Sequence, residues 1–115
     1  MILLVEIETA SPGVAVVRFT GALTLGTSLH TADSQIQKAI NQGAPNIILD
    51  MAGVPYMDSA GLGALVQASG LARQHGGELR LSGVSERVAE LIRMTRTESL
   101  LPMDADVDAS LKALG

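Results

Sequence analysis

The residues best suited to chemistry stand together in the middle of the chain, in the segment Asp58-Ser59-Ala60-Gly61-Leu62-Gly63. Asp58 is a favourable N-cap residue, so we expect a helix to start there with Ser59 at or near its first position. The backbone N–H groups at such a start lack partners within the helix and carry a positive partial charge, which suits an anion. Two glycines in the first turn cost up to roughly 1 kcal/mol each relative to alanine, so something should compensate for them.

Two interpretations of this segment are open from the residues alone. In the first, Asp58 or Ser59 only caps the helix, while Gly61 and Gly63 let it pack closely against a sheet. In the second, Ser59 presents an exposed hydroxyl for phosphorylation. A phosphate there would add nearly two negative charges at a favourable helix start but beside Asp58, so the surface would change while the fold remained. Such a change suits the control of a partner interface more than the control of folding.

Serine hydrolysis is a weak alternative. The nucleophile elbow G-x-S-x-G needs a glycine where this chain has Met57. Of the two histidines, His75 closes the helix that Ser59 opens. It is about 16 residues away, which at a rise of about 1.5 Å per residue is more than about 20 Å. His30 stays geometrically possible but has no feature in its favour. We therefore predict that the protein is not an enzyme.

Metal and cofactor motifs are equally weak. The stretch GLGALV lacks the third glycine of a dinucleotide-binding loop, and the sequence contains no Gly-Lys-Ser/Thr phosphate-binding loop. There is no cysteine to form a thiolate metal site. Asp104, Asp106 and Asp108 lack the glycine and the distal glutamate of a calcium loop, so helix capping explains them better. We predict no metal and no cofactor.

Composition narrows the classes of partner. The 115 residues carry a formal net charge of −4 and only two aromatic side chains, Phe19 and Tyr56. A chain of this kind has neither the basic patch nor the stacking residues that nucleic-acid binding needs. No apolar run approaches the roughly 20 residues of a membrane span. We expect a cytoplasmic protein that binds neither nucleic acid nor membrane.

The elements that must position Ser59 follow from periodicity and turn residues. Two β-like runs separated by TASPG predict an antiparallel hairpin, and strands then alternate with helices, which is typical of a largely parallel sheet. The first helix should bury a stripe formed by Leu25, Leu29, Ala32, Ile36 and Ile40. The predicted order is β-β-α-β-α-β-α-β-α, with strands at 2–8, 14–20, 46–50, 78–81 and 99–103 and helices after Gly21, from Asp58, over 85–94 and from near Asp106.

Two stretches also resemble a known family. ILDMAGVPYMDSAGLGALVQA (48–68) is similar to the signature of the STAS domain, the family of bacterial anti-sigma-factor antagonists, where a strand ending in Asp leads to Asp-Ser-x-Gly-Leu-Gly. VRFTGALTLGTSLHTADSQI (17–36) resembles the family's second strand, Gly-x-Leu turn and first helix. The likeness covers essentially the whole chain. It implies an α/β fold, a single STAS-like domain over 1–115, whose mixed, mostly parallel sheet of about four to five strands has about four helices packed on one side.

The resemblance further implies a partner switch in transcription regulation. Such antagonists bind an anti-sigma factor that is itself a serine kinase, and so free a sigma factor. The kinase phosphorylates the serine that matches Ser59, the phosphorylated antagonist lets go, and a phosphatase acting on phospho-Ser59 resets it. Asp58 would help to orient the hydroxyl. The expected contact surface at the helix start comprises Asp58, Ser59, Ala60, Gly61, Leu62 and Gly63.

Thr24 is a departure from the family pattern. It follows the Gly21-Ala22-Leu23 turn, where members often carry an acidic residue, and we assign it to the partner contact as an extra polar group, with a helix cap before Gly26 as the other interpretation. The alternatives for the whole protein are a STAS scaffold subunit of a larger stress-signalling assembly and a small-ligand or nucleotide-binding STAS module. We expect a monomer or a weak homodimer.

Overall fold

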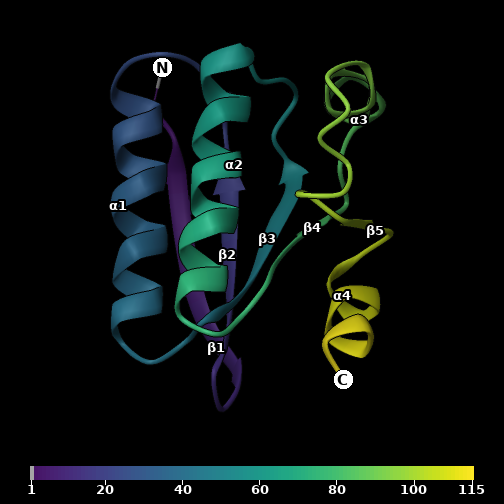
Figure 1. Ribbon diagram of the computed structural model, residues 1–115. Helices are drawn as coiled ribbons and strands as arrows, with labels where there is room; N and C mark the ends of the chain where they lie inside the picture. Colours follow the sequence, from purple (N-terminus) through teal and green to yellow (C-terminus); the bar gives the residue numbers. More distant parts are fainter. Residues whose placement is uncertain (1) are drawn as a thin grey trace.

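A mixed sheet forms the centre of the computed structural model, which describes residues 2–115. In this part of the chain the sheet has five strands, in the order β1-β2-β3-β4-β5 (Figure 1). Strand β1 pairs with β2 in antiparallel fashion, and all other neighbouring strands are parallel. This confirms the predicted mixed, mostly parallel sheet. The strands are Leu4–Ser11 (β1), Val14–Thr20 (β2), Asn46–Gly53 (β3), Leu79–Ser82 (β4) and Met103–Asp104 (β5).

Four helices complete the fold within residues 2–115, and the predicted order of elements is confirmed. Three of them start at a capping side chain, Asp58, Ser85 or Asp106, which accepts a hydrogen bond from a backbone N–H of the first turn. None of the helices in the described residues is long and apolar enough to cross a membrane. The helices are Thr27–Asn41 (α1), Ser59–Gln74 (α2), Glu86–Met94 (α3) and Val107–Leu114 (α4).

The helices do not all pack on one side of the sheet, and that part of the prediction is wrong. Helices α1 and α2 lie side by side over one face, and α3 adds Val88 and Ile92 to the same core (Figure 1). Helix α4 packs on the opposite face, where it covers an apolar patch of β2 and β3. Strands inside a parallel sheet are apolar on both faces, so the second face also needs cover. The residues in contact there are Val14, Val16 and Ile48 with Val107, Leu111 and Leu114.

Helix α1 starts later than the apolar stripe predicted. Its first residue is Thr27, because Gly26 adopts a φ of 123°, which is outside the helical range. Ala32, Ile36 and Ile40 are buried as expected. Leu25 instead precedes the helix and is 79% exposed, so the prediction that it faces the core is wrong. The loop from β2 into α1 therefore displays an apolar side chain to solvent.

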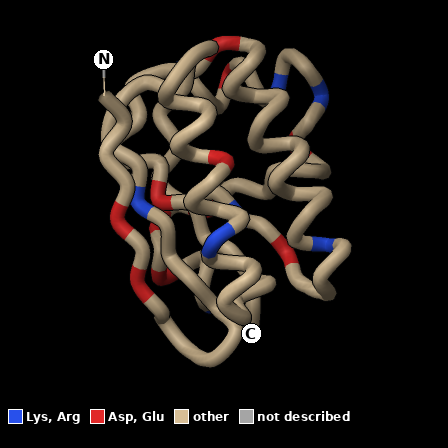
Figure 2. The backbone as a smooth tube through the Cα atoms, turned by 90° about the vertical axis from the view of Figure 1, so that its left-hand side faces the viewer, with Lys and Arg blue, Asp and Glu red and all other residues tan. Residues whose placement is uncertain are grey.

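Strand β1 forms one edge of the sheet and is mostly exposed. Its acidic residues, Glu6 and Glu8, lie along the strand that descends from the N-terminus in Figure 2. Arg18 of β2 contacts the carboxylate of Glu8 at 2.8 Å and that of Asp50 at 3.2 Å. Charged side chains on an edge strand oppose pairing with the sheet of another molecule.

Candidate functional site

The start of α2 has the geometry that the sequence predicts. Asp58 is the N-cap residue, and its Oδ1 accepts a hydrogen bond of 2.8 Å from the backbone N–H of Gly61. Ser59 is the first residue of the helix and is exposed to solvent. None of the side-chain hydrogen bonds found in residues 2–115 involves its hydroxyl, so Asp58 does not orient that group directly in this state. The exposed hydroxyl of Ser59 stands next to the electropositive end of the helix.

Asp58 also binds a segment far away in sequence. Its second oxygen, Oδ2, accepts a hydrogen bond of 3.0 Å from the backbone N–H of Leu25. The two backbones are joined as well, because the N–H of Asp58 donates to the carbonyl of Leu23 at 3.2 Å, and the N–H of Leu23 donates to the carbonyl of Tyr56 at 3.2 Å. The loop before α1 is thus fastened to the loop before α2. One carboxylate links both helix starts.

These hydrogen bonds keep Asp58 ionised. The N–H of Leu25 has the largest effect, followed by that of Gly61, and together they hold the pKa of the Asp58 carboxyl below its ordinary value. The physical cause is that both donors favour the charged form of the acceptor. At neutral pH the cap and the link to the loop are therefore both in place.

The two glycines of the first turn have different surroundings. A Cβ at Gly61 would collide with the carbonyl oxygen of Leu23 and press on the side chain of Met57. Gly61 is therefore needed for the close approach of the loop before α1. A Cβ at Gly63 would meet nothing within 4 Å, and Gly63 is exposed. The fold accounts for Gly61 but not for Gly63.

The remaining predicted contact residues are divided between surface and interior. Ala60 is half-buried, whereas Gly61 is buried and Leu62 is only 6% exposed. The prediction that Gly61 and Leu62 form part of an outward contact surface therefore disagrees with their positions. They lie beneath the surface because the loop before α1 and the core cover them. In this structure Gly61 packs against the loop before α1 and Leu62 packs in the core, so both fix the position of the helix start that carries Ser59.

Thr24 lies in the same loop and is half-buried. Its backbone N–H donates to the hydroxyl of Ser28 at 3.2 Å, and that hydroxyl donates back to the carbonyl of Thr24 at 2.8 Å. The side chain of Thr24 does not cap α1, because the N-cap residue is Gly26 and no side chain accepts a capping hydrogen bond there. The capping interpretation is therefore wrong, and Ser28 is the residue that shapes the loop.

A hollow of about 450 Å³ lies between α1 and α2 next to Ser59. Its walls carry few charges, since Asp33 is the one acidic residue and His30 the one basic residue among those that line it. The lining residues are Leu29, His30, Asp33, Ala60, Gly63, Ala64 and Gln67.

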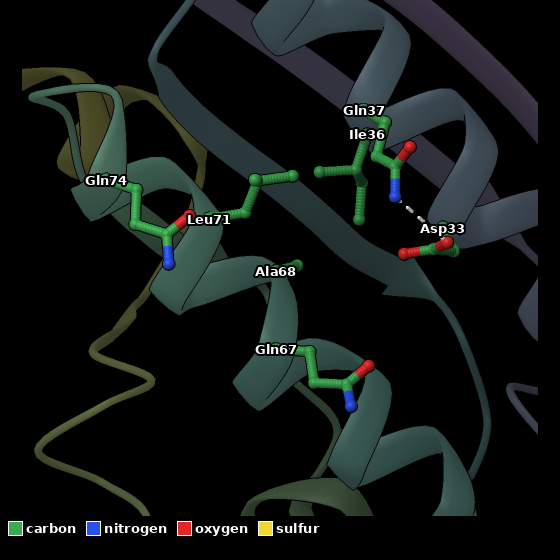
Figure 3. Close-up of a pocket in the computed structure, with 7 residues that line it drawn as sticks. All are labelled: Asp33, Ile36, Gln37, Gln67, Ala68, Leu71 and Gln74. Carbon is green, nitrogen blue, oxygen red and sulfur yellow. Dashed lines mark hydrogen bonds between the residues drawn. The ribbon is translucent and has the colours of Figure 1, made fainter.

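A second hollow continues farther along the same two helices and shares Asp33 and Gln67 with the first. Figure 3 shows this second hollow, with Leu71 and Ile36 directed toward each other across it. A hydrogen bond of 3.3 Å joins the amide of Gln37 to Asp33 at its rim.

The candidate bases for a serine nucleophile are not assembled around Ser59. His75 is the C-cap residue of α2, at the opposite end of the helix. His30 lies on α1 beside the hollow, and no side-chain hydrogen bond recorded for residues 2–115 joins it to Ser59. Within the same residues no three His, Asp or Glu side chains lie close enough together to hold a metal ion. The arrangement can present a hydroxyl to another protein.

The sequence did not predict that Leu25 lies next to the start of α2, where its N–H binds Asp58. A glycine directly after Leu25 indicates that the helical pattern is interrupted, but it does not show where the side chain of Leu25 lies. The contact between Leu25 and Asp58 spans 33 residues, so no local pattern could reveal it.

Comparison with known proteins finds a matching family model and a matching relative. The family model of the STAS domain matches residues 7–110. An anti-sigma F factor antagonist of Paenibacillus polymyxa is 32% identical over 102 residues, which are 84% of this chain and 84% of the relative. The sequence match thus covers most of both chains.

Solved structures match the fold. A putative anti-sigma factor antagonist from Thermotoga maritima superposes with a TM-score of 0.84 at 18% identity, over 97% of this chain and 93% of the other. The Bacillus protein SpoIIAA, solved in its phosphorylated form, superposes with a TM-score of 0.73 at 20% identity, over 96% of this chain and 99% of the other. At these identities the likeness establishes the architecture.

Proposed function

The chain belongs to the STAS domain family, and from that premise we propose that it is an anti-sigma-factor antagonist controlled by phosphorylation. In its unmodified form it binds an anti-sigma factor that is also a serine kinase, and thereby frees a sigma factor. The sequence match to a named anti-sigma F factor antagonist over most of both chains supports the antagonist assignment.

Ser59 is the phosphoacceptor in this proposal. Its hydroxyl oxygen would attack the terminal phosphorus of a nucleoside triphosphate bound to the kinase, while the hydroxyl proton passes to a base of the kinase and the diphosphate leaves. The new phosphate would meet unpaired backbone N–H groups at the start of α2. It would also place nearly two negative charges beside the carboxylate of Asp58.

Release of the partner follows from the same charges. In the unmodified form the charge directly beside Ser59 is the carboxylate of Asp58. After modification the interface would also have to bury a phosphate dianion, and an unpaired buried charge is strongly unfavourable. The fold itself would be unaffected, because the hydroxyl of Ser59 is exposed and makes no side-chain hydrogen bond within residues 2–115. A phosphatase that removes the phosphate would restore binding.

One observation carries the proposal: Ser59 is exposed at the first position of a helix whose start is fixed by Asp58 from two directions. The fold gains little from a serine there, since the capping is done by Asp58. SpoIIAA, which shares the fold, exists in a phosphorylated form.

The test is phosphate incorporation by the cognate kinase. Wild-type protein should accept one phosphate per chain, and Ser59→Ala should accept none while its thermal unfolding stays the same. Ser99→Ala, at another exposed serine, is the matched control and should be labelled like the wild type. Full labelling of Ser59→Ala would reject Ser59 as the acceptor.

A further inference from the structure

We propose that Leu25 is an apolar anchor for the kinase that acts on Ser59, and that this kinase carries an apolar pocket to receive it. The proposal rests on the function proposed above and adds a specificity-determining residue to it. Neither the motif around Ser59 nor the predicted contact surface includes Leu25.

The exposure of Leu25 is imposed by its backbone. The residue is 79% exposed, although the backbone N–H groups of Thr24 and Leu25 are both held by hydrogen bonds. The N–H of Leu25 itself donates to Asp58 at 3.0 Å, and the loop is closed by the paired hydrogen bonds between Thr24 and Ser28. A partner that covers Leu25 therefore has to order its side chain but not its backbone, which lowers the entropy cost of binding.

Leu25 is joined by a hydrogen bond to the residue that precedes Ser59, the proposed target of the kinase. The residue that holds its N–H, Asp58, directly precedes Ser59 in the chain. The hollow between α1 and α2 begins on the next residues, with Ala60 and Gly63 on one wall and Leu29 on the other. A protein that docks over the hydroxyl of Ser59 and the start of this hollow can also cover Leu25.

The uncharged loop around Leu25 favours an apolar pocket on the partner. From Gly21 to Gly26 the chain contains no charged side chain. Next to it, the small residues Gly63 and Ala64 leave room for a close approach, and a Cβ at Gly63 would meet nothing. In protein interfaces most of the affinity comes from a few side chains that fill a pocket on the partner and lose their contact with water. An apolar pocket on the kinase fits Leu25 better than a charged one does.

Binding of the purified cognate kinase to three proteins tests the proposal. Leu25→Ser should bind at least about tenfold more weakly than the wild type, as expected for loss of a buried apolar anchor. Met94→Ser removes another exposed apolar side chain, 75% exposed at the end of α3, and should bind within about twofold of the wild type. Both variants should unfold at nearly the wild-type temperature, since each replaces a solvent-exposed side chain.

Phosphorylation kinetics give a second readout. Leu25→Ser should raise the KM for phosphorylation of Ser59 with little change in kcat, because the anchor contacts the kinase in the ground state and in the transition state alike. Leu25→Met, which keeps an apolar side chain of similar size, should retain most of the wild-type affinity for the kinase.

The outcomes separate the two proposals. If the wild type binds the kinase and is phosphorylated on Ser59, but Leu25→Ser binds like Met94→Ser, only the anchor is overturned. If the kinase neither binds nor phosphorylates the wild type, the proposed function fails and the anchor fails with it. A selective loss with Leu25→Ser supports both.

Discussion

Asp58 joins the two segments on which the candidate site depends. One of its oxygens caps α2 and the other holds the loop that presents Leu25. Both bonds use the ionised carboxylate as acceptor, which explains why the pKa of Asp58 is lowered first by the N–H of Leu25 and then by that of Gly61. Asparagine at this position has one carbonyl oxygen, so it can keep only one of the two bonds. The residue is therefore a structural link as well as a cap.

The two glycines that follow should respond differently to the same substitution. Gly61→Ala should destabilise the protein by about 1–3 kcal/mol, because the added methyl group meets the carbonyl of Leu23 and the loop must move. Gly63→Ala meets nothing and should be neutral or stabilise α2 by up to about 1 kcal/mol. Urea unfolding of the two variants measures both changes. Equal effects on the free energy of unfolding would contradict the packing described for Gly61.

At the scale of elements, α4 is attached to the sheet by polar groups as well as by apolar ones. The hydroxyl of Ser110 donates to Asp104 at 2.6 Å, so the hydroxyl of Ser82, 2.6 Å from Ser110, must act as donor to it. Arg80 donates to both carboxylate oxygens of Asp104, at 2.8 and 3.0 Å. Both serines are fully buried, so these bonds satisfy groups that water cannot reach. The network links β4, β5 and α4.

The network makes the docking of α4 depend on pH. Hydrogen bonds from Arg80, and then from Ser110, lower the pKa of Asp104 below its ordinary value. A carboxyl with a depressed pKa in the folded state adds stability above its unfolded pKa of about 3.9 and loses it as the pH falls through the folded value. We predict that hydrogen-exchange protection of α4 falls as the pH drops below about 4, earlier than protection of β2 and β3.

Asp104→Asn is the control for this prediction. It removes the titrating group, so α4 should be less protected at neutral pH and should show no further loss that is specific to α4 below about pH 4. The same selective loss in Asp104→Asn as in the wild type would mean that another group controls α4.

Local signals in the sequence were enough to predict the order of strands and helices and the start of α2. Asp58 as a cap, Ser59 as the first helical residue and the order of strands and helices all follow from short-range rules. The side on which α4 packs and the exposure of Leu25 did not follow from them. Both depend on contacts between distant segments, namely the apolar second face of β2 and β3 and the bond from Leu25 to Asp58.

At the scale of the molecule, the sheet holds the candidate site at one end. Helices α1 and α2 start at the same end of the sheet, the upper end in Figure 1, and the loops before them are joined through Asp58. Strand β3 leads directly into the loop before α2, which places Ser59 beyond the carboxyl end of a parallel strand, where α/β folds commonly bind. Helix α4 covers the opposite face of the sheet. A modification of Ser59 can therefore change the surface while the core stays as it is.

The affinity of the purified anti-sigma kinase for two forms of this protein, unmodified and phosphorylated on Ser59, tests the account most directly. Titration calorimetry under one set of buffer conditions measures both. We predict that the unmodified protein binds and that the phosphorylated one binds at least about a hundredfold more weakly, which corresponds to about 2.7 kcal/mol. Equal affinities for the two forms would contradict the switch at the start of α2.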